Sequence, residues 1–205
     1  MYLPKHFEDA DPGHLLEVMR SYNFATLISN IEGVPFATHL PVLVREESQG
    51  LFIDAHVAAA NPHWKAFAQE SRVLVIFHGP HAYVSPTSYR SANRVPTWNY
   101  VVVHATGRVR IVESRADKLA ILGRLIDFHD PDFAPRFAAF EEDMRNALLA
   151  AIVGLEIKVE RLEGKFKLNQ HRLADDRPEL QREYEAGDEN HRAIAGWMKR
   201  LGHWK

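Results

Sequence analysis

The chain has 205 residues, a formal net charge of −2, 46% hydrophobic and 25% charged residues, which is typical of a globular protein of one domain, with or without an appendage. Its lack of cysteine excludes disulfides, thiolate nucleophiles and cysteine-ligated metals, and its near-neutral charge gives no general support to nucleic-acid binding. No apolar run reaches the roughly 20 residues of a membrane helix, and the start shows no signal peptide, so we expect a cytoplasmic protein without membrane contact.

The first third of the chain predicts short β-strands. Residues 23–29 form the first, and the turn residues 30–33 lead into a second strand over 34–44. Pro41 marks an edge or a bulge in that strand, because proline cannot donate to a ladder. Residues 51–56 are the next strand, and Asn61-Pro62 opens a short helix through residue 69.

The rest of the chain alternates strands with longer helices. Strands are expected at 72–77, 98–105, 107–113 and 152–162, and helices at 114–129, 139–150, 177–186 and 189–201. Many short strands with one inserted helix favour a closed or partly closed antiparallel barrel over a βαβ fold. We therefore predict a mainly β, α+β architecture.

The last helix carries an apolar stripe made of Ile194, Trp197, Met198 and Leu201. This spacing is typical of a packed face, so we interpret the stripe as core or dimer contact rather than as a ligand site. The predicted organisation is a barrel domain over residues 1–173 followed by a helical appendage over 174–205.

Two segments near the predicted strand ends are candidate sites. In the segment 56–64, small residues precede a helix start whose free amides suit a phosphate; an ordinary capped helix is equally consistent. In the segment 37–41, a hydroxyl and an imidazole adjoin a proline bulge; the alternative is an edge strand with a hydrogen-bonded histidine.

A third candidate is the segment 163–172, whose cations, amide and imidazole suit a phosphate or a heteroaromatic ring, or else form a solvated strand exit. The segments 83–89 and 95–100 combine prolines, polar groups and Trp98, which favours a flat, polar ligand. Twelve histidines lack metal-site spacing, and no nucleophile elbow surrounds Ser85, so we predict no metal site and assign no catalytic residue.

Several motifs occur together and in order. They are Thr38-His39-Leu40-Pro41, His56-Val57-Ala58 with Asn61-Pro62, Gly79-Pro80-His81 with Tyr83-Val84-Ser85-Pro86, Val95-Pro96-Thr97-Trp98-Asn99-Tyr100, and Glu163-Gly164-Lys165 with Lys167 and Gln170. Together they resemble the PaiB-type FMN-binding negative transcriptional regulators over most of the chain.

The resemblance implies a flavin-binding split barrel related to pyridoxamine-phosphate oxidases, a homodimer, and FMN in a cleft between the subunits. By position, it implies that residues 38–41 (Thr38, His39, Leu40 and Pro41) line the flavin edge and that the segment 56–61 holds the phosphate, with His56, Val57, Ala58 and Asn61 as the matched positions. Trp98 would lie near the ring, with Lys167 and Gln170 supplied by the late strand.

The chain departs from the family pattern at three positions. Ser88 stands where these proteins commonly have Trp, Asn169 replaces a usual Ser, and His171 replaces a usual Asn. The loop 90–94 is also shorter than in many relatives. These changes alter the stacking surface, polar rim and entrance of the expected pocket.

The sequence leaves three functions open. The first is an FMN-binding homodimer that represses transcription, with DNA as a further partner; residues 175–205 nevertheless contain seven acids and six bases, where DNA binding calls for a cationic surface. The second is a flavin-dependent oxidoreductase or a haem-handling enzyme of the same barrel. The third is a flavin-free interaction protein.

Overall fold

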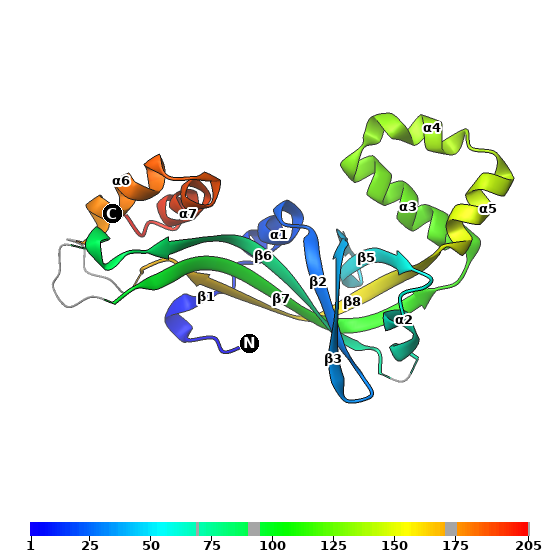
Figure 1. The fold of residues 1–205 in the computed structure, drawn as a ribbon, viewed down its shortest axis with the longest axis horizontal. Helices are drawn as coiled ribbons and strands as arrows, with labels where there is room; N and C mark the ends of the chain where they lie inside the picture. The colour runs from blue at the N-terminus through cyan, green and yellow to red at the C-terminus, as the bar shows by residue number, and fades with distance from the viewer. Residues whose placement is uncertain (69, 90–94, 171–175, 205) are drawn as a thin grey trace. The chain divides into compact units, whose positions relative to one another are not determined.

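The computed structural model describes residues 1–68, 70–89, 95–170 and 176–204. Its strands form an antiparallel sheet in the order β3-β2-β6-β7-β8-β5-β4, with β1 paired to β8 (Figure 1). The predicted class, antiparallel β with peripheral helices, is therefore confirmed.

The described elements are bounded as follows. The strands are β1 Glu8–Asp9, β2 Phe24–Ile31, β3 Val34–Pro41, β4 Leu43–Glu47, β5 Gly50–Ala58, β6 Arg72–Val84, β7 Thr97–Val112 and β8 Ile152–Lys167. The α-helices are α1 Pro12–Ser21, α2 His63–Ala66, α3 Arg115–His129, α4 Ala134–Ala138, α5 Glu142–Ala150, α6 Arg177–Ala186 and α7 Glu189–Arg200. Three 3₁₀ turns are η1 Lys5–Phe7, η2 Pro86–Ser88 and η3 Pro131–Phe133.

The chain forms two compact units, and β6, β7 and β8 each pass from one to the other. We call Met1–Ser21, His78–Val103 and Glu163–Lys205 the terminal unit, and Tyr22–Phe77 and His104–Leu162 the central unit. The predicted boundary between residues 173 and 174 lies outside the described residues and stays a prediction.

In the central unit, β2 and β3 form the predicted hairpin. Ile31 pairs with Val34, so the turn consists of Glu32 and Gly33, both with positive φ (52° and 82°). Two left-handed residues make the type I′ geometry that suits strand twist, although Glu is an unusual occupant of the first position. β3 is an edge strand, which explains why Pro41 is tolerated at its end.

Three strands are considerably longer than predicted: β6 continues past residue 77 to Val84, β8 continues past residue 162 to Lys167, and β7 is not broken at Gly107. β7 continues through this residue, where an added Cβ would stand 2.3 Å from the Lys158 carbonyl oxygen of β8. Glycine is needed there for close approach of the two backbones, not for a turn. The expectation of two strands, 98–105 and 107–113, is therefore wrong.

Between β7 and β8, the central unit carries helices. α3 begins as predicted, with the Ser114 hydroxyl accepting the Asp117 N–H at 3.1 Å. α5 begins at Glu142, three residues later than expected, and η3 and α4 were not predicted. Inside the unit, β5 buries Ile53, Ala55 and Val57 on one face.

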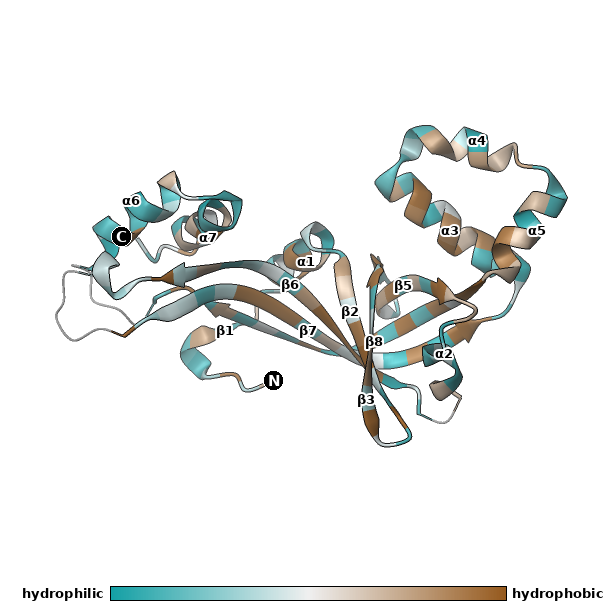
Figure 2. Ribbon diagram, in the orientation of Figure 1, coloured by the Kyte–Doolittle hydropathy of each residue, from teal (hydrophilic) through white to brown (hydrophobic). Residues whose placement is uncertain are grey.

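In the terminal unit, three of the four residues of the predicted stripe lie in the core, and Leu201, the C-cap of α7, is half-buried. Ile194, Trp197 and Met198 are buried, and the Trp197 ring meets Phe166 edge-on at 4.9 Å between centroids. Figure 2 shows brown, apolar residues along β5, β7 and β8, whereas α6 is mostly teal. The few apolar residues of α6 include the buried side chains of Leu180 and Tyr184, which hold this helix in place.

Candidate functional site

The central unit contains a completely buried histidine, His63, at the start of α2. Its Nε2 lies 2.8 Å from the Ser29 hydroxyl of β2, and its Nδ1 lies 2.8 Å from the Thr38 hydroxyl of β3. The rings of Phe36 and Phe67 flank it at 4.8 and 5.0 Å. Both imidazole nitrogens are therefore satisfied within an aromatic enclosure.

Asn61 closes this arrangement into a ring of hydrogen bonds. Its Oδ1 accepts the backbone N–H of His63 at 3.0 Å, and its Nδ2 donates to the Thr38 hydroxyl at 3.2 Å. The turn before α2 is thereby tied to the edge strand β3. We call Ser29, Thr38, Asn61 and His63 the histidine network.

Burial lowers the pKa of His63, because the protonated ring would lose its hydration. A neutral imidazole has one donor and one acceptor nitrogen, and the two hydroxyls can complement either tautomer. The network is therefore stable with His63 uncharged.

The segment 38–41 divides between the two faces of β3. Thr38 points into the histidine network and Leu40 is buried, whereas His39 and Pro41 are exposed. The Nδ1 of His39 lies 3.0 Å from the Thr26 hydroxyl on the paired position of β2. His39 is thus oriented from its own strand pair while its ring remains accessible.

The segment 56–58 lies at the end of β5. Val57 belongs to the core and Ala58 is exposed. The buried Nδ1 of His56 has no hydrogen-bond partner in the described part of the chain, and burial lowers the pKa of this imidazole. The described residues therefore leave the bonding of this nitrogen incomplete, which makes His56 a candidate for contact with a bound group.

The backbone amides after β5 are partly engaged. Ala59 donates to the Ala151 carbonyl at 2.8 Å and Asn61 to the Ala58 carbonyl at 2.9 Å. α2 is one turn long, so its dipole adds little attraction for an anion. The predicted phosphate contacts of this segment therefore need donors other than these two amides.

In the terminal unit, Trp98 presents its ring outward from β7. It is 50% exposed, with the rings of Tyr83 and His81 at 5.8 and 5.9 Å on the neighbouring strand. Asn99 faces the opposite way, is fully buried and donates to the Tyr184 hydroxyl at 3.0 Å. Trp98 therefore forms an exposed aromatic surface, and the next residue, Asn99, fixes this part of β7 through a buried hydrogen bond.

The late-strand candidates lie at and after the end of β8. Lys167 donates through Nζ to the Thr97 hydroxyl beside Trp98. The Gln170 amide instead serves the backbone, donating to the Phe166 carbonyl at 2.6 Å and accepting the Leu168 N–H at 2.7 Å. Gln170 thus shapes the turn that ends β8.

Two of the three departures from the family pattern have a structural account. Asn169 adopts φ 61°, a left-handed conformation that Asn tolerates better than most residues, and its amide contacts the Tyr89 hydroxyl at 3.2 Å. The buried Ser88 hydroxyl donates to the Glu183 carboxylate of α6. His171 and the loop 90–94 lie outside the described residues.

The central unit therefore brings Thr38 and Asn61 into one bonded set and places His39 on the outer face of the same hairpin. Trp98 and Lys167 belong to the terminal unit, where the Lys167 ammonium donates to the hydroxyl of Thr97, the residue before Trp98. Ser29 lies outside every predicted candidate segment, and His63 lies in the candidate segment 56–64 without a predicted role of its own; both complete the network. The only local signal was the position of His63 directly after Asn61-Pro62.

The described residues contain neither a metal-binding cluster nor a membrane-spanning helix. Across residues 1–68, 70–89, 95–170 and 176–204, no cluster of three or more His, Asp or Glu side chains is arranged to hold a metal ion. None of the helices in these ranges is both long and apolar enough to span a bilayer.

Comparison with known proteins assigns the family. Residues 1–161 match the family model described as "Putative FMN-binding domain". The Bacillus subtilis protein named "Protease synthase and sporulation protein PAI 2" is 34% identical over 178 residues, which is 86% of this chain and 85% of that protein. The chain belongs to the PaiB-type FMN-binding family.

A fungal protein is also similar to this chain. An uncharacterized protein of Aspergillus fumigatus is 27% identical over 99% of this chain and 94% of its own length. The similarity therefore extends over nearly the full length of both chains.

Solved structures give the fold of this PaiB-type chain. A flavocytochrome of Azotobacter vinelandii matches with a TM-score of 0.62 at 16% identity, covering 78% of this chain and 69% of that one. A FAD and heme binding protein of Mycobacterium smegmatis matches with a TM-score of 0.63 at 16% identity, covering 78% and 73%. The predicted split-barrel fold is confirmed.

Proposed function

We propose that this PaiB-type protein binds FMN as a homodimer and acts in the cytoplasm as a negative regulator of transcription. The observation that carries the FMN part is the family match over residues 1–161, a range that includes the unpaired, buried Nδ1 of His56. The regulatory part rests on membership of the PaiB-type family.

The residues present fit the chemical parts of FMN. An aromatic surface at Trp98 suits the isoalloxazine ring, and the orphan nitrogen of His56 suits a polar atom of the ligand. The groups that would hold the cofactor are Thr38, His39, Leu40, Pro41, His56, Val57, Ala58, Asn61, Trp98, Lys167 and Gln170. Bound FMN would supply one- or two-electron redox chemistry.

Their contributions differ in kind. The exposed His39, Trp98 and Ala58 are available for direct contact. Thr38 and Asn61 already bond within the histidine network, so we assign them mainly to positioning the loop that faces the ligand. Lys167 is the cation of the set, and its Nζ, which donates to the Thr97 hydroxyl beside Trp98, suits an oxygen of the ligand.

The test is a fluorescence titration of FMN into flavin-depleted protein. Replacing His56 with Ala should weaken FMN binding about tenfold, because a ligand hydrogen bond in a buried position is lost. His129→Ala, at the exposed end of α3, is the matched control and should leave the affinity unchanged. Equal FMN affinities for the wild type and His56→Ala would remove His56 from the site.

The regulatory half requires separate measurements. Light scattering should report a dimer, and DNA from regions upstream of genes should be retained in a manner that depends on sequence and falls steeply with salt. If the protein retained all DNA sequences equally, or no DNA even at low salt, the proposed regulatory role would be contradicted. The proposal that the protein binds FMN would not be affected by this result.

The alternative is a flavin-dependent oxidoreductase or a haem-handling enzyme. Its support is His81, an imidazole beside the Trp98 ring, where a substrate proton could be exchanged. Anaerobic bleaching of the flavin spectrum by NADH or NADPH, followed by recovery with an acceptor, would favour this enzyme. A colourless protein that takes up neither flavin nor haem would instead indicate an interaction protein.

A further inference from the structure

A helix-capping motif in the terminal unit fixes the position of Trp204. After α7, Gly202 adopts φ 71°; its N–H donates to the Lys199 carbonyl at 3.2 Å, and the His203 N–H donates to the Met198 carbonyl at 2.9 Å. This pair of bonds is the Schellman motif, which reverses the chain at a helix end and favours glycine at the left-handed position. The reversal brings Trp204 back over α7.

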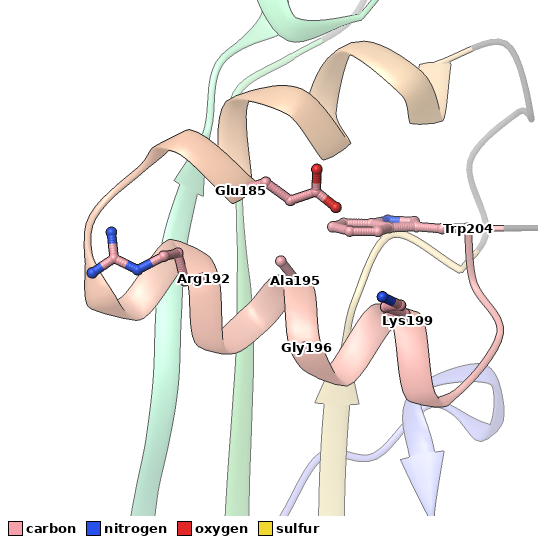
Figure 3. A pocket seen from close by; sticks show the side chains of 6 residues that line it. All are labelled: Glu185, Arg192, Ala195, Gly196, Lys199 and Trp204. Carbon is pink, nitrogen blue, oxygen red and sulfur yellow. The ribbon is translucent and has the colours of Figure 1, made fainter.

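The returning indole forms one wall of a pocket between α6 and α7. Figure 3 shows the Trp204 ring lying across the space above Ala195 and Gly196 of α7, with Glu185 of α6 at its edge. The pocket has a volume of about 250 Å³. A Cβ added at Gly196 would meet no atom within 4 Å, so the small residue leaves this space open.

The charges around the pocket are not balanced. Arg192 and Lys199 contribute two cations, and Glu185 contributes one carboxylate. Glu185 already accepts from the Gln181 amide at 2.9 Å, and Arg192 donates to the Gly187 carbonyl. Among the described residues, the Lys199 ammonium has no hydrogen-bond or ion-pair partner.

We propose that this pocket binds a small aromatic carboxylate, with its ring against the Trp204 indole and its carboxylate at Lys199. Offset stacking suits an aromatic ligand on an indole, and an unpaired ammonium suits an anion. The volume lies below the roughly 300 to 1,000 Å³ of pockets for drug-sized ligands, so one or two fused rings fit. The residues that line this pocket include none of the proposed FMN residues.

The experiment is calorimetric titration of the full chain, saturated with FMN, with three ligands of one shape. Benzoate should bind about fivefold more tightly than neutral benzamide, as expected for one exposed ion pair, and more tightly than cationic benzylamine. Lys199→Gln should remove the preference for benzoate over benzamide. Stronger binding of benzylamine than of benzoate would assign the pocket to amines through Glu185 and overturn the proposal.

Filling the pocket provides the second test. Gly196→Leu should weaken benzoate binding at least tenfold, because the new side chain occupies the open space, and leucine favours a helix more than glycine does. Gly123→Leu in α3, where an added Cβ also meets nothing within 4 Å, is the matched control. Unchanged benzoate affinity in a folded Gly196→Leu protein, checked by circular dichroism, would also overturn the proposal.

Discussion

The histidine network and the Trp98 surface differ in burial and in hydrogen bonding. The family motifs nevertheless include residues of both, namely Thr38 and Asn61 of the network and Trp98 of the surface. His63 is fully buried with both ring nitrogens bonded, whereas Trp98 is half exposed, with the Tyr83 ring edge-on and the His81 ring tilted beside it. Buried polar groups contribute to folding and to the placement of loops, while exposed rings remain free to contact a ligand. A change in the network should therefore act first on stability, and a change at Trp98 first on binding.

The largest effect is expected for His63→Ala. The substitution empties an aromatic enclosure and leaves the Ser29 and Thr38 hydroxyls without their partner, so the free energy of unfolding should fall by about 3 kcal/mol. Urea denaturation measures it. His39→Ala, on the exposed face of the same hairpin, should lower the free energy of unfolding by less than about 1 kcal/mol. Equal losses for the two variants would contradict the stabilising role assigned to His63.

Thr38→Val should have the next largest effect. Valine keeps the shape but removes the hydroxyl that joins Asn61 to His63, so about 2 kcal/mol of stability should be lost. The double variant with His63→Ala should lose less than the sum of the two single losses, because both act on one network. Additive losses of stability, measured by the same urea denaturation, would mean that Thr38 and His63 do not act in one network.

A smaller effect is expected from pH. The pKa of His63 and that of His56 lie below the ordinary value of 6.5 in the folded protein, because burial disfavours the charged rings. The unfolded chain therefore binds more protons below pH 6.5, and the free energy of unfolding should decrease as pH falls below that value. His63→Ala should make this decrease shallower; an unchanged slope would show that His63 does not contribute.

Trp98→Ala should have the smallest effect on stability and a clear effect on the ligand. Half of its side chain already faces water, so the stability change should stay below about 1 kcal/mol. FMN affinity should fall about tenfold as an aromatic contact is lost. A large loss of stability with unchanged FMN affinity would instead show that Trp98 acts on stability and not on ligand binding.

The family motifs were readable because each lies within a few residues, and the comparisons confirmed the family and the split-barrel fold that they predicted. Trp98 and Lys167 could be named from such motifs, but their contacts could not. Gln170 shows the difference: the motif suggested a ligand contact, whereas its amide bonds the backbone of Phe166 and Leu168. Whether it also contacts FMN stays a prediction.

The sequence by itself determined the features that depend on neighbours along the chain. The hairpin turn before Val34, the Ser114 cap and the buried stripe of α7 each follow from local spacing and local hydrogen bonds. The tertiary structure alone decided that His63 would join Ser29, 34 positions away, to Thr38, 25 positions away, and that Gly107 would admit the backbone of Lys158. The physical reason is that such contacts depend on which strands pair and how closely they approach, and no short window of residues contains that information.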